Sequence, residues 1–336
     1  MIDFDELDEV DVNVRLQDVL EDEPVPEKIA RVKDGVDEGD GPWGEQFGVR
    51  EEDWKRAEEP RGVLKAAAAH VVPNTILAIL VPYRDDAKRQ RSRQLQQFVQ
   101  HFSTQFLPML PPSVELRVVI LEQTRGGAFN RGKLLNMGAL WCKAFHSERT
   151  VLLCPHDVDM LPNPALMPYY CHYEEGQSVH IGWINRKYDY PNFFGGICTV
   201  PMTDFFSAGG FPNDFWGWGR EDDVLHARLL LLSRGCVLLP EAVDGIRFLD
   251  KEQPCREGDS PNVIHLLNLL GADNIFDRPS FSVLDSGEEK WLCHLLLDLK
   301  PPSAEAEPGP REVGSSVALV QKLLSQSTEA DMEHLD

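Results

Sequence analysis

The stretch ILAILV at residues 76–81 decides the fold of this chain. It consists of six consecutive apolar residues closed by Pro82, which is typical of a strand that is buried on both faces of a sheet. Two similar runs follow, LRVVIL at 116–121 and VLLC at 151–154. We therefore expect three strands at the centre of one sheet.

The segments between these runs have the spacing of amphipathic helices. Their apolar residues, three and four positions apart, are Leu95, Phe98, Val99, Phe102 and Phe106 in the first segment and Leu134, Leu135, Gly138 and Ala139 in the second. Alternating strands and helices predict an α/β fold with a mainly parallel sheet. Ligands of such sheets bind beyond the carboxyl ends of the strands, where residues 82–85 and 156–159 stand.

The charge of the chain excludes some classes of partner. Among 336 residues, 55 are acidic and 33 are basic, which gives a net charge of -22. Proteins that bind the phosphate backbone usually carry a basic surface, so we expect no nucleic-acid partner. An anionic membrane surface is disfavoured for the same reason.

No segment has the length and composition of a membrane span. The apolar stretch at residues 66–81 is interrupted by His70, Pro73, Asn74 and Thr75, whereas a span needs about 20 largely apolar residues. The first ten residues lack the basic and apolar regions of a signal peptide. We expect no membrane insertion by this chain.

The composition divides the chain into three parts. Residues 1–61 form an acidic extension with mobile or loosely packed parts, either a solvating tail or an arm that binds a partner. Residues 62–300 form a single domain. Residues 301–336 begin as a proline-rich linker and continue into a short helix, which is predicted by the spacing of Val317, Val320, Leu323 and Leu324.

Two carboxylates follow the third strand. Asp157 and Asp159, separated by Val158, can approach one hard cation, and Mg²⁺ or Mn²⁺ would then bridge to a diphosphate. The alternative is a turn in which the aspartates bond to backbone amides. The ordered segments on both sides of the pair favour a metal site.

A second acidic group begins a helix at residues 221–223, directly after the aromatic segment FWGWGR. Acids in the first turn of a helix complement its dipole, which is the structural alternative. Three adjacent acids repel one another, however, and the tryptophans offer flat faces for sugar rings. We expect one carboxylate here to act as a general base toward a hydroxyl group.

Two arginines are candidates for diphosphate contacts. Arg84 follows the first strand, and Arg131 precedes the second helix with Phe129 beside it in the sequence.

Five segments, in this order, resemble the motifs of the β-1,4-galactosyltransferase family, glycosyltransferase family 7. They are VPYRD (81–85), FNRGKLLNMG (129–138), HDVDMLP (156–162), FFGG (193–196) and GGFPNDFWGWGREDD (209–223). The resemblance covers about residues 74 to 250. The HDVD and WGWGRED variants are most similar to the xylosylprotein β-4-galactosyltransferase branch.

The resemblance implies a GT-A fold and an inverting, Mn²⁺-dependent transfer from a UDP-sugar. It also implies residue roles. The donor would be bound by Pro82, Tyr83, Arg84, Phe129, Arg131, Asp157, Val158, Asp159 and Trp218. The acceptor would be bound by Phe193, Trp218, Gly219, Arg220 and Asp223. Asp159 would ligate the metal, and Asp222, with Glu221 beside it, would take the proton of the acceptor.

The chain departs from the family pattern at several positions. Asp86 stands where the family has a second arginine, which weakens one phosphate contact. Phe193 replaces the usual tyrosine, so donors with an N-acetyl group at C2 could be admitted. The further metal ligand would be Asp250, with His265 as the fallback. A Cys154–Cys171 bridge is compatible with the family's disulfide.

We expect a hexosyltransferase that moves galactose from UDP-galactose to a sugar hydroxyl of a glycan or glycoprotein in a β-1,4 link. The alternatives are the same chemistry with UDP-GalNAc, UDP-GlcNAc or UDP-glucose, or a glycan-binding relative without catalysis. The resemblance implies the Golgi lumen, whereas a chain without an anchor fits a soluble cytoplasmic location.

Overall fold

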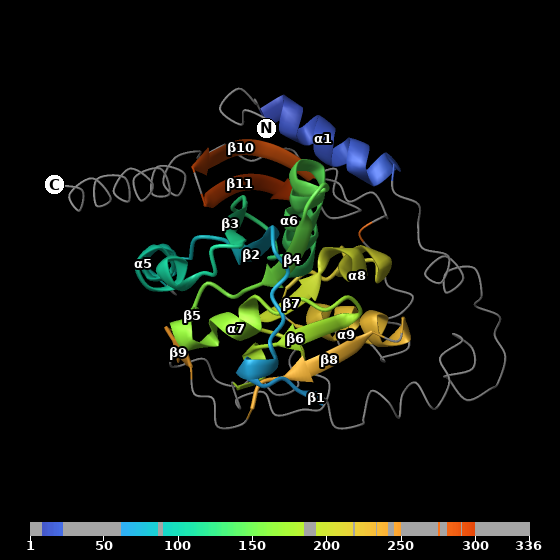
Figure 1. Cartoon of the computed structure of the whole chain (residues 1–336). Coiled ribbons are helices and arrows are strands. Elements are labelled where there is room, and N and C mark those ends of the chain that lie inside the picture. Colours follow the sequence, from blue (N-terminus) through green and yellow to red (C-terminus); the bar gives the residue numbers. More distant parts are fainter. Residues whose placement is uncertain are drawn as a thin grey trace.

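The computed structural model describes residues 9–22, 62–86, 90–184, 193–217, 219–232, 234–240, 245–249, 275, 281–289 and 291–299. These residues form a nine-stranded mixed sheet with helices on both faces (Figure 1). The strand order is β1-β8-β6-β7-β4-β2-β3-β11-β10.

The three expected strands lie side by side and parallel at the centre of the sheet. They are β2 (Thr75–Tyr83), β3 (Val114–Gln123) and β4 (Thr150–Pro155), with β2 in the middle. All nine residues of β2 are buried, because neighbouring strands cover its edges and helices cover both of its faces. The sequence prediction of a buried parallel centre is confirmed.

The flanks of the sheet mix both directions. On one side, β11 (Leu292–Leu299) is parallel to β3, and β10 (Phe281–Glu289) is antiparallel to β11. On the other side follow β7 (Cys198–Pro201), β6 (Gln177–His180), β8 (Gly235–Leu238) and β1 (Gly62–Val63). A separate two-stranded ribbon joins β5 (Met160–Pro162) to β9 (Ile246–Phe248).

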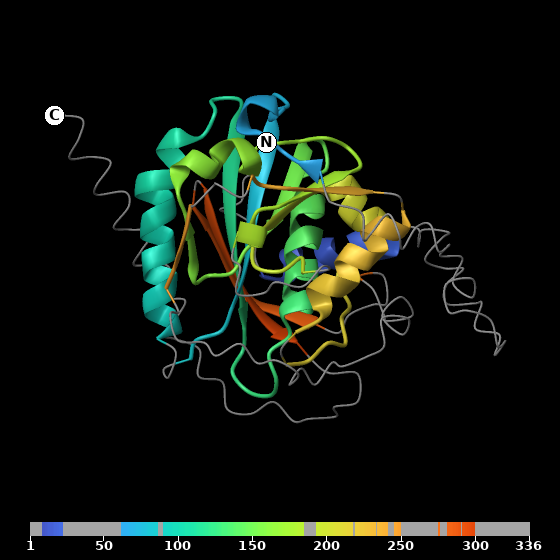
Figure 2. The same ribbon diagram turned by 90° about the horizontal axis from the view of Figure 1, so that it is seen from below.

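The two faces of the sheet bury two separate cores. Alternate residues of β2 point to opposite faces, with Ile76 and Leu80 in one core and Leu77 and Val81 in the other. Helices α6 (Arg131–His146), α8 (Met202–Ser207) and α9 (Glu221–Leu231) contribute to the first core. The second core receives residues from α5 (Arg91–His101) and from α7 (Met167–Tyr170). Helix α5 continues as a π turn (Phe102–Phe106), which contributes to the same core. Figure 2 shows α5 and α6 on either side of the central strands. Short 3-10 turns are Ala66–Ala68, Leu107–Met109, Pro164–Leu166 and Gly182–Ile184.

One part of the acidic extension is integral to this fold. Helix α1 (Glu9–Asp22) lies beside α6 and β10 (Figure 1), and it buries Val12, Leu16 and Leu20 in the first core. Residues 9–22 are therefore not among the mobile or loosely packed parts expected in the extension. The remaining residues of the extension, and the short helix expected near Val320, lie outside the described residues.

Asn13 fastens α1 to strand β10. Its side-chain amide donates to Val283 O at 2.9 Å and accepts from Val283 N at 2.8 Å. We predict that Asn13→Ala lowers the stability of the domain by about 1–3 kcal/mol, because two backbone groups lose their partner. The melting temperature should fall by roughly 2–4 °C for each kcal/mol. Val14→Ala is the control, since Val14 is 51% exposed. Equal melting curves for the two variants would contradict the role of Asn13.

The structure also bears on the expected absence of a membrane span and on the possible Cys154–Cys171 bridge. No helix among the described residues is long and apolar enough to cross a membrane. Cys154 and Cys171 are both buried and both free, so the disulfide that the family resemblance allowed is not formed.

Candidate active site

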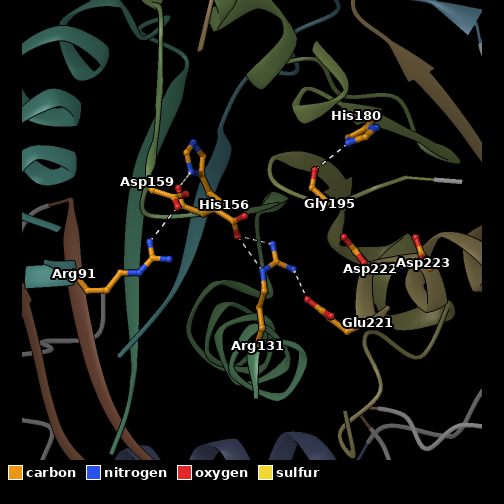
Figure 3. A network of polar contacts seen from close by, with 10 residues as sticks. Arg91, Arg131, His156, Asp159, His180, Gly195, Glu221, Asp222 and Asp223 are labelled. Atoms are coloured by element: carbon orange, nitrogen blue, oxygen red, sulfur yellow. Dashed lines mark hydrogen bonds and ion pairs between the residues drawn. The ribbon is translucent and has the colours of Figure 1, made fainter. Parts of the chain in front are cut away.

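Four chain segments bring polar side chains together beyond the carboxyl end of β4. Strand β4 is followed by residues 156–159, α6 begins at Arg131, α9 begins at Glu221, and α5 begins at Arg91. Figure 3 shows how the side chains from these segments converge. Residues 82–85 and 156–159 thus lie at the carboxyl ends of β2 and β4, as the order of strands and helices predicted.

Arg131 connects two of these segments. Its Nε and Nη2 lie 3.0 and 2.9 Å from Asp157 Oδ1, and its Nη1 lies 3.2 Å from Glu221 Oε1 (Figure 3). Asn130 caps α6 by accepting from Lys133 N at 2.9 Å, which fixes the start of the helix and so the position of Arg131. Burial alone would lower the pKa of Arg131, but Asp157, Glu221 and Asp222 raise it above its ordinary value. The guanidinium stays charged.

The acids of α9 have unusual protonation properties. Burial raises the pKa of Glu221 to about 7, the charge of Asp222 adds to this, and Arg131 opposes it. Burial also raises the pKa of Asp222. For Asp222, the loss of water outweighs the favourable position of a carboxylate at a helix N-terminus. Asp222 is thereby a stronger base than an exposed aspartate.

The pKa of Glu221 predicts an effect on stability. The folded protein retains a proton on Glu221 between the ordinary value of 4.5 and about 7, so stability falls as pH rises through this range. We predict that Glu221→Gln raises the melting temperature at pH 8, by roughly 2–4 °C if the gain is ~1 kcal/mol, and changes it little at pH 4.

Glu115→Gln is the control of opposite sign. Burial alone would raise the pKa of Glu115, but its hydrogen bond from Arg149 and the charge of Arg117 lower it. This variant should lose stability at pH 8. Melting curves of both variants at the two pH values check the prediction. If Glu221→Gln changed the melting temperature equally at both, the raised pKa would be refuted.

Asp159 has a partner that the sequence analysis missed. Arg91 Nη1 lies 3.1 Å from Asp159 Oδ2, and the same nitrogen donates to Gln94 Oε1 at 2.7 Å (Figure 3). The family pattern places its second arginine at position 86, where this chain has Asp86. The signal that could have found Arg91 is its place at the start of the predicted helix, seven residues after Arg84.

The described residues fit a metal ion in part. Among them, no group of three or more His, Cys, Asp or Glu side chains could hold one. The carboxylate of Asp159 is 18% exposed and already has the Arg91 cation beside it, so the position suits a positive charge. Leu249 N donates to Asp159 O at 2.8 Å, and the residue after Leu249 in the sequence is Asp250. Asp250 and His265 themselves lie outside the described residues.

The residues expected around the nucleotide form a second cluster at the end of β2. The Arg84 guanidinium lies over the Phe129 ring, 5.3 Å from its centroid, and its Nη1 donates to Gly127 O at 3.2 Å. Pro82 and Tyr83 are buried in β2. Val158 is 5% exposed and packs in the second core, so its side chain is buried away from solvent.

The expected acceptor residues are only partly brought together. Arg220 Nη1 pairs with Asp223 Oδ2 at 2.9 Å, and Asp223 is 3% exposed. Gly219 and Arg220 have positive φ angles of 95° and 78°, which turn the chain into α9. Phe193 is buried against the His180 ring, 5.1 Å between centroids. Trp218 lies outside the described residues.

Two family models match the chain and together cover more than half of it. The one described as the N-terminal region of glycosyl transferase group 7 matches residues 54–172. The one described as the N-terminal domain of galactosyltransferase matches residues 178–244.

Curated relatives show the same likeness. Human β-1,4-galactosyltransferase 3 is 27% identical over 278 residues, which are 80% of this chain and 67% of that protein. Human β-1,4-galactosyltransferase 4 is 34% identical over 158 residues, which are 46% of this chain and 42% of that protein.

Two solved structures share the fold. The catalytic domain of Drosophila β-1,4-galactosyltransferase 7 in complex with xylobiose has a TM-score of 0.54 and 26% identity, over 68% of this chain and 94% of that one. A mutant of that enzyme in complex with manganese, UDP-Gal and xylobiose has a TM-score of 0.53 and 24% identity over the same shares. The expected GT-A fold is confirmed, and the chain belongs to the β-1,4-galactosyltransferase family, glycosyltransferase family 7.

Proposed function

We propose that this protein transfers galactose from UDP-galactose to a sugar hydroxyl in a β-1,4 link, with Mn²⁺ as cofactor and with residues 62–300, on which α1 packs, as the catalytic domain. The observation that carries the proposal is the Arg131 bridge, since it joins Asp157, on the donor side, to Glu221, next to Asp222 on the acceptor side. One charged group thus fixes the separation of the two sides of the site.

The basic residues of the site suit the leaving UDP. Arg84 and Arg91 approach the carboxyl ends of the strands from two segments, and Asp159 with Asp250 would hold the metal. When bound, Mn²⁺ neutralises charge that develops on the diphosphate. Arg91 would serve as the second arginine that Asp86 does not provide, and it would contact the diphosphate from the start of α5.

Asp222 would take the proton of the acceptor hydroxyl. Its raised pKa makes it a better base, and Glu221 beside it accepts from Arg131 and so remains in place. Asp223 is neutralised by Arg220 in the same turn, which leaves Asp222 as the carboxylate of this group available to the acceptor.

A panel of UDP-sugars tests the proposal. UDP-galactose, UDP-GalNAc, UDP-GlcNAc and UDP-glucose are each incubated with Mn²⁺ or with EDTA, and release of UDP is measured with and without xylobiose. Xylobiose is the first acceptor to test, because the related Drosophila enzyme was solved with it. Metal-dependent release with UDP-galactose that increases with acceptor is expected. A stronger response to another donor would assign that sugar instead.

Phe193 is expected to decide how strictly the donor is selected. A site that only lacks a hydrogen bond discriminates weakly, so the preference for UDP-galactose over UDP-GalNAc in kcat/KM should stay below about 10³-fold. Phe193→Tyr should increase that preference. Phe194→Tyr is the control, because Phe194 stacks on His226 in the core instead. A wild-type preference above this limit would require a steric block elsewhere.

The second candidate function is glycan binding without catalysis. The Arg91–Asp159 ion pair favours it, since an arginine already occupies the position beside the expected metal ligand. Glycan binding unaffected by EDTA, with no release of UDP from any donor in the panel, would select this alternative.

Localisation in the Golgi lumen, which the family resemblance implies, is tested by imaging the tagged chain with organelle markers.

A further inference from the structure

A buried histidine contacts the glycine loop at the centre of the site. His180, at the end of β6, is 1% exposed, and its Nε2 lies 3.0 Å from Gly195 O (Figure 3). A carbonyl oxygen can only accept, so Nε2 carries the hydrogen of this bond. The His180 ring also contacts both aromatic residues that precede the glycine, with centroids 5.1 Å from Phe193 and 5.3 Å from Phe194.

Gly195 supports the carboxylate proposed as the base. A Cβ atom at this position would overlap Asp222 Oδ2 and would lie 2.7 Å from Phe193 Cε2. The Asp222 carboxylate is therefore packed directly on the Gly195 backbone. A displacement of this backbone moves the surface on which the base rests.

Gly196, the residue after Gly195, contacts Asp157 on the donor side of the proposed site. Gly196 O accepts from Asp157 N at 3.0 Å, and Asp157 is the carboxylate held by Arg131. Gly195 O also accepts from Ile197 N at 3.1 Å, which folds the loop back on itself. Residues 195 and 196 thus contact both proposed halves of the site.

We propose that His180 is a positioning residue of this enzyme, which acts through the Gly195–Gly196 backbone on both Asp222 and Asp157. The inference rests on the proposed function of that site. His180 does not reach the reacting atoms. It holds the glycine carbonyl by one directed hydrogen bond and thereby sets the placement of two carboxylates.

Two substitutions separate this role from general packing. His180→Gln keeps an amide nitrogen near the position of Nε2, whereas His180→Asn places its amide near Nδ1, too short to reach Gly195 O. Both side chains are polar and smaller than imidazole. The control is His294→Asn. His294 is also buried, and its Nε2 lies 3.0 Å from Glu122 Oε2. It belongs to β11, which is five strands away from β6 in the sheet.

The expected result is a difference between the two His180 variants. His180→Asn should lower kcat for transfer about 10–10²-fold, since small misplacements of catalytic groups are costly. It should also weaken binding of UDP with Mn²⁺ through Asp157. His180→Gln should restore both to within about threefold of wild type, while His294→Asn, with a similar loss of melting temperature, keeps its kcat. Equal kcat values in the Gln and Asn variants would overturn the proposal.

Hydrogen exchange keeps this test separate from the proposed function. Amides of residues 193–198 should exchange faster in His180→Asn than in His180→Gln, whatever sugar the enzyme transfers. Equal exchange in the two variants would refute the positioning role. If exchange differs but the wild-type protein releases no UDP from any donor, the proposed function fails and the contact of His180 with the loop stands.

Discussion

Replacing Asp222 by asparagine should lower kcat for sugar transfer by about 10²–10⁴-fold, the usual range for loss of a general base. The amide keeps the shape of the side chain on Gly195 but cannot accept the acceptor proton at neutral pH. Binding of UDP with Mn²⁺ should change little, because the metal depends on Asp159. Steady-state rates and UDP calorimetry on this variant measure the two effects separately.

Asp214→Asn is the matched control, since Asp214 is an exposed aspartate that precedes the same helix. Its kcat should equal that of the wild type. If Asp222→Asn kept transfer within a few-fold, Glu221 would become the base, and its pKa of about 7 would fit that role. If UDP binding were lost instead, the acids of α9 would belong to the donor site and our assignment would be wrong.

Replacing Asp159 by alanine should abolish metal-dependent binding of UDP. In the wild type, UDP at 100 times its Kd should stabilise the fold by about 2.7 kcal/mol with Mn²⁺ and far less with EDTA. Asp159→Ala should remove the difference between the two buffers. Transfer should fall by roughly 10²–10³-fold, because the charge on the departing diphosphate is no longer neutralised. Thermal unfolding with UDP in both buffers measures the binding.

Arg91→Gln gives the complementary result. Without the guanidinium beside Oδ2, the Asp159 carboxylate should bind Mn²⁺ alone more tightly, as followed by electron paramagnetic resonance. Binding of UDP should weaken at the same time, since one phosphate contact is lost. Equal stabilisation by UDP in Mn²⁺ and in EDTA, for the wild type, would argue against a metal at Asp159.

Local sequence was sufficient to predict the centre of the fold and the sheet edge at which the candidate site lies. Apart from Arg117, the runs at 76–81, 116–121 and 151–154 are apolar without alternation, which is typical of strands buried on both faces. When helices connect such strands, the strands run parallel, and their carboxyl ends therefore lie at the same edge of the sheet. Asp157 and Asp159 follow directly from such an end, and Glu221 and Asp222 follow from a recognisable helix start.

Tertiary structure alone decided the partners and the protonation of those residues. Arg91 pairs with Asp159, which is 68 residues away in the sequence, and Asn13 bonds to Val283, which is 270 residues away. No local pattern encodes such a pair, because it exists only after the sheet has assembled. The same reason makes Glu221 a group with a pKa near neutrality. Its residue type and helix position indicate an ordinary acid, whereas its burial, and the charges of Arg131 and Asp157 near it, arise only once the chain has folded.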